Sequence, residues 1–238
     1  MKIRKANTRG HFENNWLNSW HTFSFSSYYD PTFMGFSALR VINDDKIKPF
    51  QGFGVHPHKD MEIVTFMLKG ELTHQDSLGN KHILKEGNVQ LMRAGSGITH
   101  SEVNLHPTVS HLLQIWILPK EKNLTPGWWE KQFNVNSSIQ CIVEPISSNK
   151  DKSLINTEIT EEGLKIAQNA YILSISKNSL LDMKKFGTSD IYIHVFEGEV
   201  EINNEVLYEG DAVYQEKYND NIIINANSGK CLVFIFPN

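Results

Sequence analysis

Two pairs of potential metal ligands occur within residues 52–104: His56 with His58, and His100 with Glu102. The members of each pair are two residues apart, and in an extended strand side chains at i and i+2 point to the same face. Two such strands that face a common cavity would bring three imidazoles and one carboxylate to one point. The spacing therefore predicts a metal site built on β-strands.

The donor types narrow the kind of site. Imidazole nitrogen and carboxylate oxygen together suit first-row divalent ions such as Fe, Ni, Co, Mn, Cu or Zn. The set contains no cysteine, which argues against a closed structural zinc site. Four protein ligands on an ion that prefers six leave two positions open, so we expect chemistry or ligand capture at this site.

The composition limits the partners and the compartment. The chain has 40% hydrophobic and 21% charged residues, and its net charge of −4 gives no electrostatic basis for binding nucleic acid or an anionic membrane. The amino-terminal segment lacks the apolar run of a signal peptide, and no 18-residue apolar span occurs. Cys141 and Cys231 fit two reduced, buried thiols. We therefore expect a cytoplasmic protein.

Short runs of apolar and β-branched residues alternate with Gly, Asn and Asp turns, the rhythm of a sandwich or small barrel. Strands are expected at residues 61–68, 88–92 and 111–118, and the last should be central in its sheet because both of its faces are largely apolar. The polar stretch at residues 120–143 is predicted to be a linker.

The two halves of the chain resemble each other. The segments MLKGELTHQ and LKEGNVQLM are echoed by VFEGEVEIN and LYEGDAVYQ, which indicates a duplicated β-unit. The second copy contains only His194, with no acid or imidazole two residues away in its strand. We therefore predict a metal-binding domain at residues 1–130 and a domain without metal ligands at residues 131–238.

Several segments of the first half resemble a known family. The stretches GFGVHPHKDMEIVTFMLKG and EGNVQLMRAGSGITHSEVN resemble the cupin motifs, and more closely those of the pirin family of two-domain cupins. The segments WHTFSFSSYYDP, FSALRVINDD and HQDSLGN resemble bacterial pirin-like proteins described as quercetin 2,3-dioxygenases. The resemblance is strong over residues 1–120 and weak beyond them. It implies an all-β fold of two cupin-type jelly-roll barrels, the second degenerate.

The resemblance also implies a ligand set. Carried over by position, it makes His56, His58, His100 and Glu102 the ligands of one divalent ion, with iron expected. In many cupins outside the pirin group the glutamate of the first motif is itself a ligand, which here would be Glu62. Strand parity leaves both carboxylates open, and the pirin pattern favours Glu102.

The implied activity is the opening of a flavonol such as quercetin, or a related enol, by O2. Glu102 would serve as general base toward the substrate hydroxyl, and Phe53, Gln114 and Trp116 are candidates for the pocket wall, with plain barrel core as the alternative. Two other functions remain open. One is a non-enzymatic, metal-dependent regulatory protein that binds a protein partner, as the eukaryotic pirins imply. The other is an orphan cupin that acts on a different small metabolite.

Residues around these motifs carry further expectations. Pro57 removes a backbone donor between the two histidines, so their segment should lie at a sheet edge. Gly95 and Gly97, shortly before His100, permit a tight backbone near the cavity. His21 has no partner two residues away and is predicted to be structural, and His74 is expected in a surface or turn position.

Overall fold

The structure of the chain, a computed structural model, describes residues 1–134, 137–146 and 162–238. Within these residues β-strands are joined by turns and by two short 3₁₀ helices, η1 (Ala6–Thr8) and η3 (Met183–Phe186). The predicted all-β class is therefore confirmed. None of the helices among the described residues is long and apolar enough to span a lipid bilayer.

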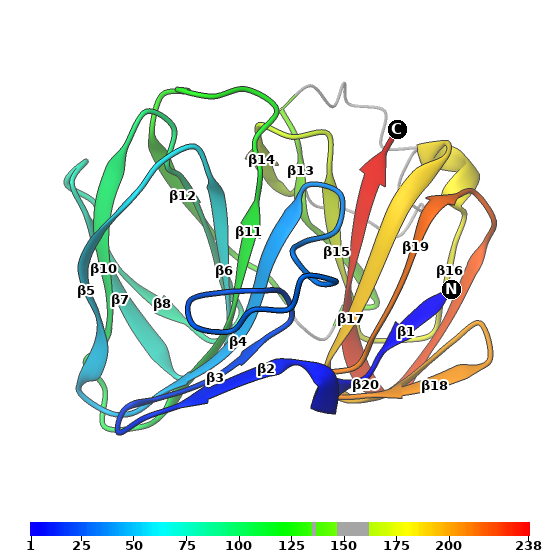
Figure 1. Ribbon diagram of the computed structural model, residues 1–238, viewed down its shortest axis with the longest axis horizontal. Coiled ribbons are helices and arrows are strands. Elements are labelled where there is room, and N and C mark those ends of the chain that lie inside the picture. Colours follow the sequence, from blue (N-terminus) through cyan, green and yellow to red (C-terminus); the bar gives the residue numbers. More distant parts are fainter. Residues whose placement is uncertain (135–136, 147–161) are drawn as a thin grey trace. The chain divides into compact units, whose positions relative to one another are not determined.

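The strands divide into two compact units (Figure 1). The first comprises Arg9–Phe133, and the second comprises Met1–Thr8 with Asn134–Asn238. The units separate close to the expected domain boundary, but the first eight residues belong to the second unit. The reason is that β1 (Lys2–Arg4) pairs antiparallel with β19 (Ala212–Tyr218).

The first unit contains two antiparallel sheets. One has seven strands in the order β12-β9-β6-β11-β4-β3-β2, and the other has four in the order β5-β10-β7-β8. The seven are β2 (Gly10–Glu13), β3 (Leu17–His21), β4 (Leu39–Ile47), β6 (Glu62–Lys69), β9 (Asn88–Arg93), β11 (Ser110–Ile117) and β12 (Gly127–Gln132). The four are β5 (Gln51–His58), β7 (Glu71–Asp76), β8 (Lys81–Lys85) and β10 (Ile98–Asn104). The strand expected at residues 111–118 is indeed central, as β11 between β6 and β4.

The two sheets of the first unit pack face to face. Leu72 of β7 and Leu84 of β8 share one hydrophobic cluster with Met67 of β6 and Leu112 of β11, and all four side chains are essentially inaccessible to solvent. This cluster removes apolar surface from water and fixes the spacing between the sheets. Polar residues that face inward from both sheets form the site described below.

The second unit is one nine-stranded sheet. Its main order is β1-β19-β17-β20-β15-β13-β14, with β16 added to β20 and β18 added to β17. Besides β1 and β19, the strands are β13 (Ile139–Pro145), β14 (Leu164–Ile166), β15 (Tyr171–Ile175), β16 (Ser179–Leu181), β17 (Ser189–Ile202), β18 (Glu205–Tyr208) and β20 (Ile222–Pro237). Its core cluster is mainly aliphatic, formed largely by Ile, Leu and Val side chains.

The linker predicted at residues 120–143 is wrong in part. Residues 135–136 lie outside the described residues, but the interval contains β12, which pairs with β9, and the start of β13, which pairs with β15. Trp128 of β12 stacks on His82 at 4.3 Å between ring centroids. The segment of β12 therefore forms a strand that is stabilised by aromatic packing, although its glycine and polar residues suggested a connecting loop.

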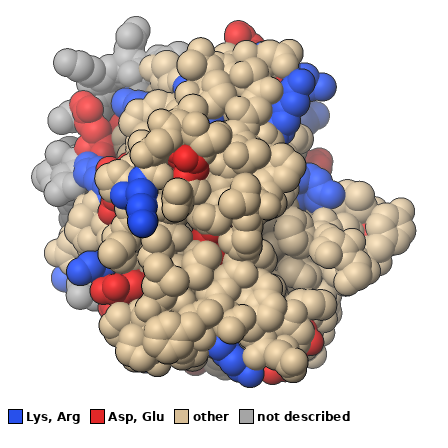
Figure 2. Space-filling view, turned by 90° about the vertical axis from the view of Figure 1, so that its left-hand side faces the viewer, with Lys and Arg blue, Asp and Glu red and all other residues tan. Residues whose placement is uncertain are grey.

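Figure 2 shows the face of the molecule that lies at the left of Figure 1, where uncharged residues predominate. Lysine and arginine side chains on this face are dispersed and intermixed with acidic ones. Binding to a nucleic-acid backbone depends on several clustered cations. This face therefore has no cluster of cations of the kind that binds a nucleic-acid backbone.

A tight turn precedes β10. Gly95 has a φ of +47°, and a Cβ atom at this residue would lie 2.0 Å from the carbonyl oxygen of Leu124. The same carbonyl accepts a hydrogen bond from the backbone N–H of Ser96 at 2.8 Å. The turn has no room for a side chain, and it sets where β10 begins.

We predict that Gly95→Ala lowers the free energy of unfolding by more than about 1–2 kcal/mol, the usual cost of a left-handed conformation for a residue with a Cβ, because the clash adds to it. Gly54→Ala is the control, since a Cβ there meets no atom within 4 Å. Urea denaturation measures both variants. Equal stability of Gly95→Ala and the wild type would contradict the prediction.

Candidate metal centre

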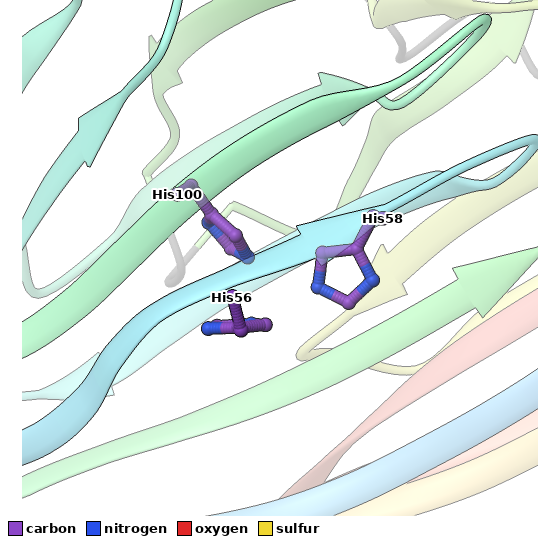
Figure 3. A group of neighbouring side chains, drawn as sticks. All are labelled: His56, His58 and His100. Atoms are coloured by element: carbon purple, nitrogen blue, oxygen red, sulfur yellow. The ribbon is translucent and has the colours of Figure 1, made fainter.

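Three histidine side chains lie together where β5 and β10 pair. In the antiparallel register His100 is opposite His56, and Ile98 is opposite His58. Burial alternates along β10, so His100 points inward between more exposed neighbours. Figure 3 shows the three rings side by side, two from β5 and one from β10. The predicted edge position is confirmed, because β5 is the terminal strand of its sheet.

The three imidazoles are close enough to share an ion. Their ring centroids are 4.8 Å apart for His56 and His58, 4.4 Å for His56 and His100, and 4.9 Å for His58 and His100. One nitrogen of each ring lies within 4.8 Å of the other two. Metal bonds to imidazole nitrogen are about 2.0–2.1 Å long, so the rings would move inward to bind an ion between them.

Glu102 lies beside this cluster. It lines the same cavity as His56 and His58. Its carboxylate belongs, however, to a second group of ligand-type atoms, with His74 and His100, that also lie within 4.8 Å of one another. The structure thus brings the three predicted histidines together and sets Glu102 next to His100, outside that set of three. The assignment of Glu102 as fourth ligand stays a prediction.

Hydrogen bonding leaves ring nitrogens available to an ion. The Nδ1 atom of His56 lies 2.7 Å from the carbonyl oxygen of Gly54, which can only accept, so Nδ1 carries the hydrogen and Nε2 keeps its lone pair. Both ring nitrogens of His100 are buried without a hydrogen-bond partner among the described residues. A buried unsatisfied polar atom costs about 1–3 kcal/mol. The donor set therefore fits a divalent ion that prefers imidazole.

The charge state of the histidines also suits an ion. Burial and, to a smaller extent, the imidazoles of His100 and His56 together lower the pKa of His58 to about 4. Burial lowers the pKa of His100 to about 3, with His56 and His74 acting in the same direction. Both rings are neutral at pH 7, and the neutral form is the one that binds metal.

Three side chains from the facing sheet hold Glu102. Its Oε1 atom accepts hydrogen bonds from Gln90 Nε2 at 2.6 Å and from Thr65 Oγ1 at 3.2 Å. Its Oε2 atom accepts one from Gln114 Nε2 at 2.7 Å. A carboxylate oxygen can accept more than one hydrogen bond. Oε2 therefore keeps an acceptor position for an ion or a substrate hydroxyl.

Two tryptophans orient the amides that hold Glu102. Trp128 Nε1 donates to the Oε1 atom of Gln90 at 2.9 Å, and Trp116 Nε1 donates to the Oε1 atom of Gln114 at 3.2 Å. An indole N–H can only donate, so each amide turns its oxygen toward the tryptophan and its NH₂ group toward Glu102. The carboxylate is thus fixed from both sides.

The other candidate carboxylate, Glu62, lies elsewhere. It is fully buried on β6, and its Oε1 atom accepts a hydrogen bond from Arg93 Nε at 2.7 Å. It is absent from the described residues that line the cavity and from both groups of ligand-type atoms. Its ion pair with Arg93 accounts for its burial.

A cavity of about 180 Å³ adjoins the histidines and lies between the two sheets. Phe53, Gln114 and Trp116, the three candidates for a pocket wall, all line it. Trp116 packs edge-on against His58, with ring centroids 4.9 Å apart. Contact of these side chains with a substrate stays a prediction.

The structure adds lining residues that the sequence did not assign to a cavity. Ser19 and His21 of β3, with Asn43 and Asp45 of β4, face the same cavity. The predicted structural role of His21 is incomplete, because this histidine is part of the cavity wall. The only signal in the sequence was the two-residue period of a strand, which puts Leu17, Ser19 and His21 on one face; in the structure this face of β3 is buried. That pattern shows which residues share one face of β3, but it does not show which residues lie opposite that face across the cavity.

The expected surface position of His74 is wrong. Its side chain is fully buried, its Nε2 atom lies 3.1 Å from Asp76 Oδ2, and its ring stacks on Trp128. It also lies next to His100, with ring centroids 5.4 Å apart. The prediction was based on the hairpin that follows His74 in the sequence, but the residue lies on the inner face of β7.

The paired sheets of the first unit, with imidazoles and a carboxylate around a cavity, together with a second β-unit, define a two-domain cupin. A family model described as Pirin matches residues 2–117, and one described as Quercetinase C-terminal cupin domain matches residues 154–235. The chain belongs to the pirin family. The predicted fold of two cupin domains is thereby confirmed.

Individual relatives agree with this membership. A protein of Escherichia coli strain K12 named quercetin 2,3-dioxygenase is 42% identical over 241 residues, which cover 99% of this chain and 98% of the relative. The crystal structure of YhhW from Escherichia coli has a TM-score of 0.86 and 40% identity, over 99% of this chain and 97% of that chain. A second structure is that of bacterial pirin YhhW in complex with nickel(II), with a TM-score of 0.86, 40% identity, and coverage of 99% and 98%.

The half-buried His58 and the buried His100 should make the stability of the metal-free protein depend on pH. In the unfolded chain they titrate near 6.5, whereas in the folded protein His58 and His100 stay neutral down to about pH 4 and 3. Below about pH 6.5 the unfolded state therefore binds more protons, so the free energy of unfolding falls as the pH decreases toward 4. Urea denaturation between pH 7.5 and 5 measures this fall.

His100→Leu should show a shallower decrease than the wild type, because one of the two histidines is gone. His106→Gln, at an exposed histidine, is the control and should keep the wild-type slope. The same slope in His100→Leu and the wild type would contradict the prediction.

Proposed function

We propose that the chain is a metal-dependent dioxygenase that opens a flavonol-like substrate such as quercetin, or a related enol, with O2. The observation that carries the proposal is the cavity of about 180 Å³ whose lining includes His56, His58 and Glu102. A protein that only bound an ion would not require a cavity of this size beside it. The name of the relative in Escherichia coli supports the same reaction class.

In this proposal His56, His58, His100 and Glu102 hold one divalent ion. The unsatisfied nitrogens of His100 and the fixed tautomer of His56 support the assignment. When bound, the ion supplies Lewis acidity toward an enolic hydroxyl and redox chemistry with dioxygen. We expect iron, and the nickel(II) complex of YhhW supports a site that accepts more than one such ion.

Glu102 receives the proton of the enolic hydroxyl in the proposed reaction. Oε1 is already engaged by Gln90 and Thr65, while Oε2 has Gln114 as its donor and keeps an acceptor position. The proton therefore moves to Oε2, into the acceptor position that the ion would otherwise use, so Glu102 serves as ligand or as base and not as both at once. A general base in such a position is typically worth about 10²- to 10⁴-fold in rate.

The aromatic lining positions a planar substrate and excludes water. Phe53 and Trp116 line the cavity, and Trp116 is itself fixed by the rings of Phe25 and His58, with centroids 5.4 and 4.9 Å away. Rings held in this way lose little freedom when a ligand packs against them. The hydrogen bond between Trp116 and Gln114 links this aromatic wall to the orientation of Glu102.

The test compares oxygen uptake by protein loaded anaerobically with iron(II), using quercetin and smaller enols as substrates. The wild type should consume O2, and Glu102→Gln should lower kcat by at least about 100-fold because the proton acceptor is lost. His106→Gln is the control and should match the wild type.

Metal analysis of the same samples separates the alternatives. Ion bound to the wild type without oxygen uptake from any enol would contradict the proposal and favour a metal-dependent regulatory protein. Uptake with a small enol but not with quercetin would favour a cupin that acts on another metabolite. Full activity in Glu102→Gln would contradict the role of Glu102 alone.

A further inference from the structure

A polar wall faces the histidines across the cavity. It consists of Ser19, His21, Asn43 and Asp45, which are paired in register on β3 and β4: Ser19 is opposite Asp45, and His21 is opposite Asn43. These strands belong to the seven-stranded sheet, whereas His56, His58 and Glu102 belong to the four-stranded sheet. The cavity therefore has polar groups on both sheets.

Hydrogen bonds within the polar wall fix the tautomer of His21. Its Nδ1 atom lies 2.9 Å from Asn43 Oδ1 and 3.3 Å from Ser19 Oγ. The amide oxygen of Asn43 can only accept, so Nδ1 carries the hydrogen. Ser19 Oγ in turn donates to Asp45 Oδ1, which leaves its own oxygen free to accept from His21.

The other nitrogen of His21 is then a hydrogen-bond acceptor. Burial lowers the pKa of His21 below its ordinary value, although the hydrogen bond with Asn43 acts in the opposite direction, so the ring is neutral at pH 7. Nε2 has no hydrogen-bond partner among the described residues, and it is not one of the fully enclosed unsatisfied atoms. His21 lines the cavity, so this lone pair is available to a ligand there.

The polar wall suits a ligand with a neutral hydrogen-bond donor rather than an anionic ligand. None of the described residues that line the cavity is a lysine or an arginine. The polar wall offers the Nε2 lone pair of His21 and the carboxyl group of Asp45. Burial raises the pKa of Asp45 to about 7, but a ligand carboxylate would still meet the lone pair of His21 with no cation beside it, which is unfavourable in a buried site. A hydroxyl group can donate to His21 without this cost.

The volume of the cavity limits the size of the enclosed group. A buried cavity of about 150 Å³ accommodates a benzene-sized ligand, and sites for drug-sized molecules occupy about 300–1,000 Å³. At about 180 Å³ this cavity encloses one ring or an open chain of similar bulk. A three-ring flavonol would keep two of its rings outside.

From these observations we propose that His21 is a substrate-binding residue: its Nε2 atom accepts a hydrogen bond from a second hydroxyl of a compact, one-ring or open-chain hydroxy-enone whose enolic oxygen faces the histidine cluster. Asn43 is the positioning residue that fixes the required tautomer. The inference rests on the proposed function and narrows its substrate class.

The experiment uses pairs of 3-hydroxy-4-pyranones, one-ring analogues of the flavonol core. Within a pair, one compound carries a methyl and the other a hydroxymethyl group at the same ring carbon, and each free carbon is tested in turn. Calorimetry measures their binding to metal-loaded wild type, His21→Phe and the control His106→Gln, and oxygen uptake gives kcat/KM for the same compounds and for 3-hydroxyflavone.

We expect the wild type to prefer the hydroxymethyl compound by about three- to tenfold at one ring position, as one net hydrogen bond predicts. His21→Phe should lose this preference while still binding the methyl compound, which shows that its cavity is intact. His21→Gln, with an amide oxygen as acceptor, should keep part of the preference, and it replaces the Phe variant if that variant binds neither compound. His106→Gln should behave as the wild type.

No preference at any ring position in the wild type, or an unchanged preference in His21→Phe, would overturn the role of His21 and leave the proposed function standing. A kcat/KM for 3-hydroxyflavone above that of every one-ring compound would overturn the size argument. Failure of the metal-loaded wild type to bind any pyranone, together with no oxygen uptake from any enol, would overturn the proposed function itself.

Discussion

The antiparallel pairing of β5 with β10 is the constraint on which the site depends. Because His100 is opposite His56 in that register, two histidines from one strand and one from its neighbour reach the same point without help from a loop. A shift of the pairing by one residue would turn His100 outward, since side chains alternate between the faces of a strand. The turn at Gly95, which has no room for a Cβ, precedes β10 and limits such a shift.

The two sheets of the first unit divide the work of the site. The four-stranded sheet supplies the three clustered imidazoles and Glu102, and the seven-stranded sheet supplies the groups that orient Glu102. Gln90 and Gln114 illustrate this division: each amide is turned by a tryptophan so that its NH₂ group meets the carboxylate. Hydrogen bonds that fix the neighbours of a reactive group in this way hold the group in place at little entropic cost. The core of the second unit is mainly aliphatic, in contrast to the polar groups around the cavity of the first unit.

The sequence predicted what depends on local spacing. The two-residue interval between His56 and His58, with Pro57 between them, was enough to place both on one face of an edge strand. It could not give contacts between strands that are distant in the chain. His21 was read as structural because its partners, Asn43 and the far side of the cavity, are set by sheet pairing. The pairing of β1 with β19 likewise has no local signal, which is why the first eight residues were expected in the other domain.

X-ray absorption at the K-edge of the bound ion tests the central claim most directly, because it reports the ligands without requiring a substrate. For protein loaded with iron(II) or nickel(II), the account predicts scattering from three imidazoles together with oxygen, and the loss of one imidazole in His56→Gln. A coordination shell without imidazole, or a spectrum that does not change in His56→Gln, would contradict the account.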